Sequence, residues 1–136
     1  MELAQPQYMF PPLPCSAIVY RAILNKRFID RHNNNRITSG AFFKRLKESG
    51  NDRKGLSVDL ANQCTIEEVR APFRACFGVA TLHVGRIRDI ALDVEQDTPK
   101  HANITGVPYK EDDLVQAERL AGLLAKQARL AWSLNP

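Results

Sequence analysis

Three short runs with β-type patterns lie between Val79 and Thr105, and they constrain the fold more than any other part of the sequence. The first reads Val-Ala-Thr-Leu-His-Val, the second Ile-Ala-Leu-Asp-Val and the third His-Ala-Asn-Ile-Thr, with Gly-Arg-Ile-Arg and then Pro99 between them. Apolar residues alternate with polar ones along these runs, as in strands with one buried face, and the separating residues are typical of turns. We therefore expect the three runs to be strands of one sheet.

The sequence before these runs predicts two more strands and a short helix. Residues 17–24 and 55–60 are rich in β-formers, which favours strands. Residues 39–46 fit either a short helix or a strand. Thr65 and Glu68 have the spacing of a capping box, so a helix is expected to begin at Ile66, and Pro72 should stop it about one turn later.

An amphipathic pattern extends from Asp112 to about Ser133. Its apolar residues recur at three- and four-residue spacing: Leu114, Ala117, Ala121, Leu124, Ala128 and Ala131. This stripe predicts a long helix with one face against a sheet, and its alanines allow a close approach. Together with the strands, it predicts a single α+β domain over residues 15–136, in which a mostly antiparallel sheet packs against a long C-terminal helix.

Residues 1–14 have a different composition, because they hold four of the eight prolines. A proline-rich segment favours an extended conformation, so we expect an N-terminal arm. Two interpretations are open: the arm lies over the domain with Tyr8, Met9 and Phe10 in a groove, or it docks into an aromatic groove of a protein partner.

Composition limits the classes of function. No apolar run approaches the roughly 18 residues that a membrane span needs, and the N-terminus lacks the basic region of a signal peptide. The three cysteines form no Cys-x-x-Cys pair, which indicates reduced thiols. We expect a cytoplasmic protein that does not bind membranes. The formal charge of +4 permits an anionic ligand, a nucleic acid or an acidic protein partner.

The histidines are candidates for acid–base chemistry, because imidazole can exchange a proton near neutral pH. His101 follows a proline turn, which places it at a strand end, and Asn103 should point to the same face. His83 is a second candidate. With Cys64 and Cys76 these histidines have no closely spaced pair, as structural zinc sites usually have, so no metal site is expected.

Arginines near the strands are candidates for phosphate binding. Arg86 and Arg88, with Arg70 and Arg74 upstream, could form an anion-binding patch, or they could pair with nearby acids such as Asp89 and Asp93. A second basic cluster consists of Lys44, Arg45, Lys47, Arg53 and Lys54. The sequence has no P-loop, no dinucleotide-binding glycine motif and no Gly-x-Ser-x-Gly elbow, which excludes the enzyme classes that those motifs mark.

The first expected strand contains Tyr20-Arg21-Ala22, and the next contains Gly55-Leu56-Ser57-Val58. These two segments resemble the opening of small bacterial ADP-ribosyltransferase-like and RES-type toxin domains. The resemblance implies a protein that consumes NAD and in which Arg21 contacts this cofactor. Glu95 is the candidate for the catalytic glutamate of that family.

Three functional hypotheses follow. The first is a small enzyme of toxin or defence type acting on a nucleotide or a nucleic acid, with Arg21, Ser57, Glu95 and His101 as catalytic residues. Binding in that enzyme would involve His83, Arg86, Arg88 and Asn103. The second is a non-catalytic basic module that binds RNA, DNA or an acidic protein. The third is a subunit of a larger assembly, held through residues 1–14 or the C-terminal helix.

Overall fold

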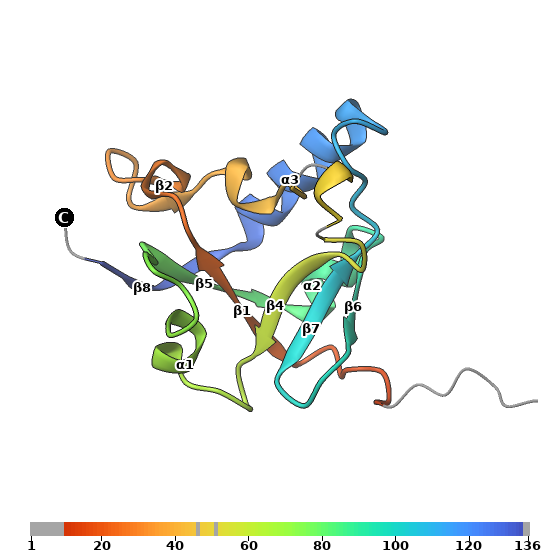
Figure 1. Cartoon of the computed structure of the whole chain (residues 1–136), viewed down its shortest axis with the longest axis horizontal. Helices are drawn as coiled ribbons and strands as arrows, with labels where there is room; N and C mark the ends of the chain where they lie inside the picture. The colour runs from red at the N-terminus through yellow and green to blue at the C-terminus, as the bar shows by residue number, and fades with distance from the viewer. Residues whose placement is uncertain (1–9, 46, 51, 135–136) are drawn as a thin grey trace, which may run out of the picture.

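A six-stranded antiparallel sheet is the main element of the computed structural model, which describes residues 10–45, 47–50 and 52–134. The strand order is β6–β7–β4–β1–β5–β8 (Figure 1). These strands are β1 (Ile18–Ile23), β4 (Leu56–Leu60), β5 (Gly78–His83), β6 (Asp93–Gln96), β7 (His101–Thr105) and β8 (Arg129–Ser133). A separate hairpin pairs β2 (Ile29–Asp30) with β3 (Arg36–Ile37). The expected α+β fold with a mostly antiparallel sheet is confirmed.

The helices are short except for the last one. They are α1 (Ile66–Arg70), α2 (Val84–Asp89) and α3 (Leu114–Gln127), with 3-10 turns η1 (Lys26–Phe28), η2 (Ser39–Phe42) and η3 (Lys47–Ser49). The middle of the predicted stripe is the buried face of α3, because Ala117, Ala121 and Leu124 are fully buried, whereas Leu114 is 52% exposed and Ala131 lies in β8. The capping box at the start of α1 is also present: the Thr65 hydroxyl accepts from the Glu68 amide, and the Glu68 carboxylate accepts from the Thr65 amide.

The structure corrects two sequence-based boundaries. The C-terminal helix was expected to reach about Ser133, but it ends at Gln127, and Ala128 turns the chain into β8 with an extended backbone. Residues 129–133 pair with β5, so their backbone groups form hydrogen bonds to that strand in place of the hydrogen bonds that a longer helix would have.

The segment around Gly85 was expected to be a turn between two strands, but it is helix α2. Val84 and Ile87, three positions apart, are both fully buried and give this helix its apolar face. The strand expected from Ile90 begins only at Asp93, because Ala91 adopts a positive φ of 63° that breaks the extended backbone.

The two faces of the sheet are covered differently. One face carries the main core, where apolar side chains of the strands pack against α2, α3 and η2. The opposite face is covered by α1 only over β1, β5 and β8, where Val69 packs with Val79 and Trp132. In Figure 1 no helix lies in front of β4 and β7, and α2 is seen behind them. This arrangement leaves the β4–β7 part of the second face open.

Residues 10–14 are the described part of the expected N-terminal arm. Residues 10–13 line a hollow of about 310 Å³ beside β6, and Leu13 packs against the main core. Of the residues that one interpretation places in a groove, Phe10 lines this hollow, and Tyr8 and Met9 lie outside the described residues. Among the helices of residues 10–45, 47–50 and 52–134, none has the length and apolar character to cross a membrane.

Candidate active site

Ser57 lies on the open part of the second face because of the alternation within β4. Its neighbours Leu56 and Val58 are buried in the main core, so the side chain between them points the other way and is exposed. An exposed hydroxyl on a strand held by two buried neighbours is accessible and well positioned.

His101 comes to Ser57 from the adjacent strand. In the β4–β7 register Ser57 lies opposite Asn103, and Asp59 lies opposite His101, so Ser57 and His101 are diagonal neighbours on one face. The Ser57 Oγ atom is 2.5 Å from Nε2 of His101. The expectation that His101 and Asn103 share a face agrees with this register.

Asp97 completes the group from the loop that joins β6 to β7. Its Oδ1 lies 2.7 Å from Nδ1 of His101, and its Oδ2 accepts a 2.9 Å hydrogen bond from the amide of Asn103. The loop is closed by its own bonds, since the Asp97 amide donates to the His101 carbonyl and the Thr98 hydroxyl accepts from the His101 amide. The carboxylate is therefore fixed beside the imidazole.

Electrostatics determine the direction of these hydrogen bonds. Partial burial acts to raise the pKa of Asp97, but hydrogen bonds from His101 and Asn103 outweigh it and hold that pKa below its ordinary value. An ionised carboxylate only accepts hydrogen bonds, so we assign the imidazole proton to Nδ1. Nε2 is then free to accept the proton of the Ser57 hydroxyl.

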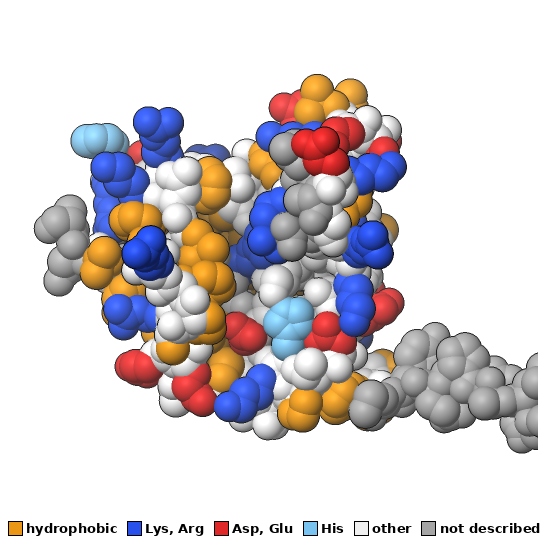
Figure 2. Space-filling model, viewed as in Figure 1, with side chains coloured by type: hydrophobic (Ala, Val, Ile, Leu, Met, Phe, Trp, Pro, Cys, Tyr) orange, Lys and Arg blue, Asp and Glu red, His pale blue; other side chains and the backbone are white. Residues whose placement is uncertain are grey.

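A hollow of about 400 Å³ begins at Ser57 and Asp59 and extends between β1 and β4. Its walls are mostly aromatic and apolar, formed by Tyr20, Ala22, Leu24, Phe28, Phe43 and Phe73. Figure 2 shows the molecule hollowed on this side, with a histidine flanked by acidic side chains over β4 and β7 and basic side chains above it. The Ser57 hydroxyl is thus next to a space that fits an apolar group.

Arg21 lies at the inner wall of this hollow. Its guanidinium donates to the Ser57 carbonyl at 2.8 Å and, through two N–H groups, to the Ala41 carbonyl at 2.9 and 3.0 Å. Burial lowers the pKa of Arg21 to about 10, and the negative charge of Asp52 partly offsets this, so the side chain is cationic at neutral pH. In this arrangement Arg21 positions the backbone at Ser57; direct contact with a cofactor stays a prediction.

Other charges in the hollow have partners. Arg45 donates to both carboxylate oxygens of Asp52, and the Lys44 ammonium lies 4.6 Å from the centre of the Tyr109 ring. Burial raises the pKa of Asp59, whereas the neighbouring His101 acts to lower it. Of the three cations that line the hollow, Arg45 is paired with an acid, whereas Arg21 donates to backbone carbonyls and Lys44 lies against an aromatic ring.

The remaining candidate residues lie apart from this group. Glu95, in β6, is exposed and lines the hollow beside residues 10–13. His83 is exposed at the end of β5, which β1 separates from β4. Arg86 is exposed on α2, and Arg88 pairs with Asp93 at 2.9 Å, as the second interpretation of these arginines predicted.

Most of the basic cluster from Lys44 to Lys54 is also paired with acids. Arg45 bonds Asp52, Lys47 bonds Asp112 at 2.9 Å, and the Lys54 ammonium lies 3.9 Å from Asp97. Within the parts of the chain that the structure describes, no three His, Cys, Asp or Glu side chains are grouped as metal ligands would be.

The analysis of the sequence singled out Ser57, His101 and Asn103 but missed Asp97. The available signal was local: Asp97 precedes His101 by four residues across Thr98 and Pro99, so a tight hairpin brings the two together. Comparison of the chain with family models, curated proteins and solved structures gives no match.

Proposed function

We propose that this protein is an enzyme that transfers an acyl group through Ser57, with His101 as general base and Asp97 as its orienting partner. One observation carries the proposal: the continuous series of hydrogen bonds from Ser57 Oγ to His101 Nε2 and from His101 Nδ1 to Asp97. A hydroxyl, an imidazole and a carboxylate linked in this order are the combination that activates serine as a nucleophile.

The reaction would have two steps. The Ser57 oxygen attacks the carbonyl carbon of an ester while its proton passes to Nε2 of His101, and Asp97 stabilises the imidazolium. His101 then gives this proton to the departing alkoxide, which leaves an acyl group on Ser57. A water molecule, deprotonated by the same imidazole, releases the acid and restores the hydroxyl.

The hollow beside Ser57 supports a neutral substrate with an apolar or aromatic group. Its walls include Phe28, Phe43 and Phe73, and its basic side chains are already bonded to Asp52, to backbone carbonyls or against an aromatic ring. Dianionic phosphate binds best where several cations are free to donate to it, and here Arg21 and Arg45 already donate to carbonyls and to Asp52, which leaves only Lys44. An ester of a small aromatic or aliphatic acid fits better.

The sequence-based hypothesis of a nucleotide-directed enzyme shares Ser57 and His101 with this proposal and differs in the bond that is attacked. A comparison of model substrates distinguishes the acyl-transfer proposal from the nucleotide hypothesis. Hydrolysis of p-nitrophenyl esters with no action on bis-p-nitrophenyl phosphate or NAD supports acyl transfer, and the reverse pattern supports the nucleotide hypothesis.

Covalent labelling with a fluorophosphonate tests the nucleophile without knowledge of the natural substrate, because such reagents modify activated serines. We expect mass spectrometry to locate the label on Ser57 and to find none in Ser57→Ala. His101→Ala should also remove labelling, and Asp97→Asn should slow it by at least about 100-fold, since the imidazole loses its orienting carboxylate.

Ser16→Ala is the matched control, because Ser16 is likewise exposed but lies in the segment before β1. Its labelling rate should equal that of the wild type. An unlabelled wild-type protein, or labelling of Ser57 that persists at full rate in His101→Ala, contradicts the proposal.

A further inference from the structure

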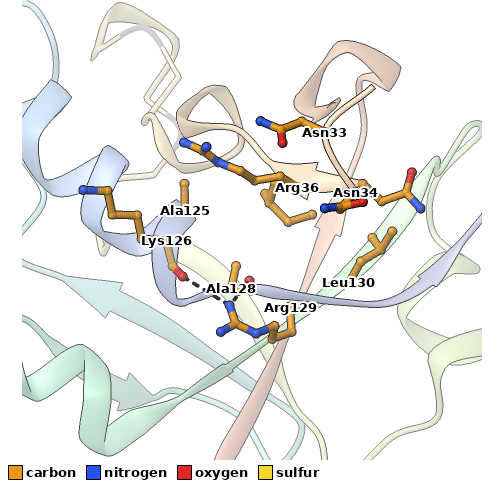
Figure 3. Close-up of a pocket in the computed structure, with 10 residues that line it drawn as sticks. Asn33, Asn34, Arg36, Ala125, Lys126, Ala128, Arg129 and Leu130 are labelled. Atoms are coloured by element: carbon orange, nitrogen blue, oxygen red, sulfur yellow. Dashed lines mark hydrogen bonds between the residues drawn. The ribbon is translucent and has the colours of Figure 1, made fainter. Parts of the chain in front are cut away.

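A third hollow, of about 670 Å³, lies between the β2–β3 turn and the end of α3 (Figure 3). It shares no lining residue with the hollow at Ser57. Its lining combines three asparagines, three cations and an apolar part: Asn33, Asn34, Asn35, Arg36, Ile37, Ala125, Lys126, Ala128, Arg129 and Leu130. Its volume is in the range of sites for small ligands.

The cations of this hollow differ from those near Ser57, because no acidic side chain lines it. Among the described residues, neither Arg36 nor Lys126 takes part in an ion pair, and both are exposed. Figure 3 shows the Arg36 side chain extended from β3 toward the end of α3. Two uncompensated positive charges thus border one concave surface.

The C-terminus of α3 would by itself repel an anion, since helix carbonyls carry partial negative charge there. Arg129 counters this effect: its guanidinium donates to the carbonyls of Lys126 and Ala128 at 3.2 and 3.1 Å. The carbonyls that border the hollow are therefore bonded to a cation, and Arg36 and Lys126 are left for a ligand.

The asparagines form a turn that can present amide groups. Asn34 and Asn35 have φ of 57°, a conformation that asparagine adopts more readily than most residues, and the Arg36 amide closes the turn on the Asn33 carbonyl. The apolar part of the lining consists of Leu130, which is partly exposed, and of Ile37, Ala125 and Ala128, which are at most 8% exposed and form the floor beside it. Amide groups can form hydrogen bonds with the polar edge of a planar ring, while the apolar surface packs against the face of the ring.

From these features we propose that this hollow binds a nucleotide unit, with the phosphate on Arg36 and Lys126 and the base on the apolar surface near the asparagines. Guanidinium and ammonium groups without acidic partners are the side chains that bind phosphate best. The unit could be a free nucleotide or part of a single strand, and its binding is independent of the chemistry at Ser57.

Calorimetric titration of the full chain with AMP, inorganic phosphate and a short single-stranded oligonucleotide tests the proposal. We expect AMP to bind more tightly than phosphate, because only AMP also uses the apolar surface. Tighter binding of the oligonucleotide than of AMP identifies a strand as the source of the nucleotide. Arg36→Gln/Lys126→Gln should weaken binding of AMP about tenfold or more.

The matched control is Arg53→Gln/Arg74→Gln, which removes two exposed cations that line none of the three hollows described above. It has the same net charge as the test variant and should change AMP affinity by less than about threefold. Equal losses in the two double variants would attribute binding to net charge and overturn the site. Absence of AMP binding by the wild type at millimolar concentration would overturn it as well, and circular dichroism checks that each variant is folded.

Discussion

Arg21 occupies the place where β1 and β4 stop pairing. The two strands are in register only at Val19 with Leu60 and at Tyr20 with Asp59, and beyond these pairs they diverge around the hollow. The Arg21 guanidinium bonds the Ser57 carbonyl and the Ala41 carbonyl, so one side chain connects β4 to η2 where strand pairing is lost.

Replacing Arg21 by methionine should therefore reduce stability. The change leaves the part-buried Ala41 carbonyl and the exposed Ser57 carbonyl without this donor, and it also removes a charge whose burial is unfavourable, so we expect a net loss of about 1–3 kcal/mol of unfolding free energy. Urea unfolding measures the loss, with Arg74→Met, at an exposed position, as the control that should change stability little. A loss below about 0.5 kcal/mol for Arg21→Met would show that the two carbonyls do not depend on this side chain.

For Asp59 we predict the opposite effect, a gain in stability when the side chain is replaced. Burial raises its pKa, so the folded protein disfavours its charged form; the penalty grows as the pH rises from the ordinary carboxyl pKa of about 4 and is complete above the raised pKa. Asp59→Asn should stabilise the protein at pH 7, by less than about 1 kcal/mol because the group is partly solvated.

Near pH 3 the gain in Asp59→Asn should vanish, because the carboxyl is then mostly protonated in both the folded and the unfolded states. Chemical denaturation at the two pH values checks both statements. Destabilisation at pH 7 would instead mean that a neighbouring group stabilises the Asp59 charge in the folded protein.

Sequence reasoning reached part of the candidate site at this scale. His101 is named by its residue type and its place at an expected strand end, and Ser57 by the resemblance of its strand to the toxin domains. Nothing in the sequence states which strands are neighbours. The contact between them depends on the β4–β7 register, in which Ser57 faces Asn103. A shift of one residue would turn one of the two side chains to the opposite face.

At the scale of elements, α3 covers the main core and should be required for folding. Leu124 is fully buried on its inner face, so Leu124→Ala removes apolar contacts and leaves a cavity, at a cost of about 2–5 kcal/mol. Val115→Ala on the same helix is the control: Val115 is 75% exposed, and its truncation should stay within about 0.5 kcal/mol. Similar losses in the two variants, measured by urea unfolding, would contradict this packing.

The elements could be predicted where one pattern was repeated over enough residues. The α3 stripe and the capping box at Thr65 were strong signals of that kind. The segment from Ala128 to Ser133 was ambiguous, because Ala128 and Ala131 continue a helical spacing while Leu130 and Trp132 alternate as in a strand. Pairing with β5 decides between the two, and this is a long-range effect that local spacing does not contain.

At the scale of the whole molecule, paired carboxylates should make stability dependent on acid. The pKa values of Asp52, Asp93 and Asp97 are lowered, because hydrogen bonds from Arg45, Arg88 and His101 among others outweigh the opposing effect of burial. Their contribution is complete above the ordinary carboxyl pKa of about 4 and is lost as the pH falls through the lowered values. We expect the urea concentration at the unfolding midpoint to decrease as the pH is lowered below about 4.

Asp52→Asn should reduce this acid dependence. The variant is less stable than the wild type at pH 7, because Arg45 loses an ionised partner, and the difference should shrink as the pH falls toward 2. Urea unfolding at several pH values measures it. A difference that stays constant over this range would show that Asp52 contributes through packing and not through its charge.

The β6–β7 hairpin also has a consequence for evolution and engineering. The proposed base and its orienting carboxylate are four residues apart on one tight loop, and only the nucleophile comes from another strand. The two residues can therefore be transferred together to another antiparallel hairpin. The acceptor hairpin needs only a neighbouring strand with a serine at the diagonal position. Insertion of a single residue between Asp97 and His101 would be enough to separate the pair.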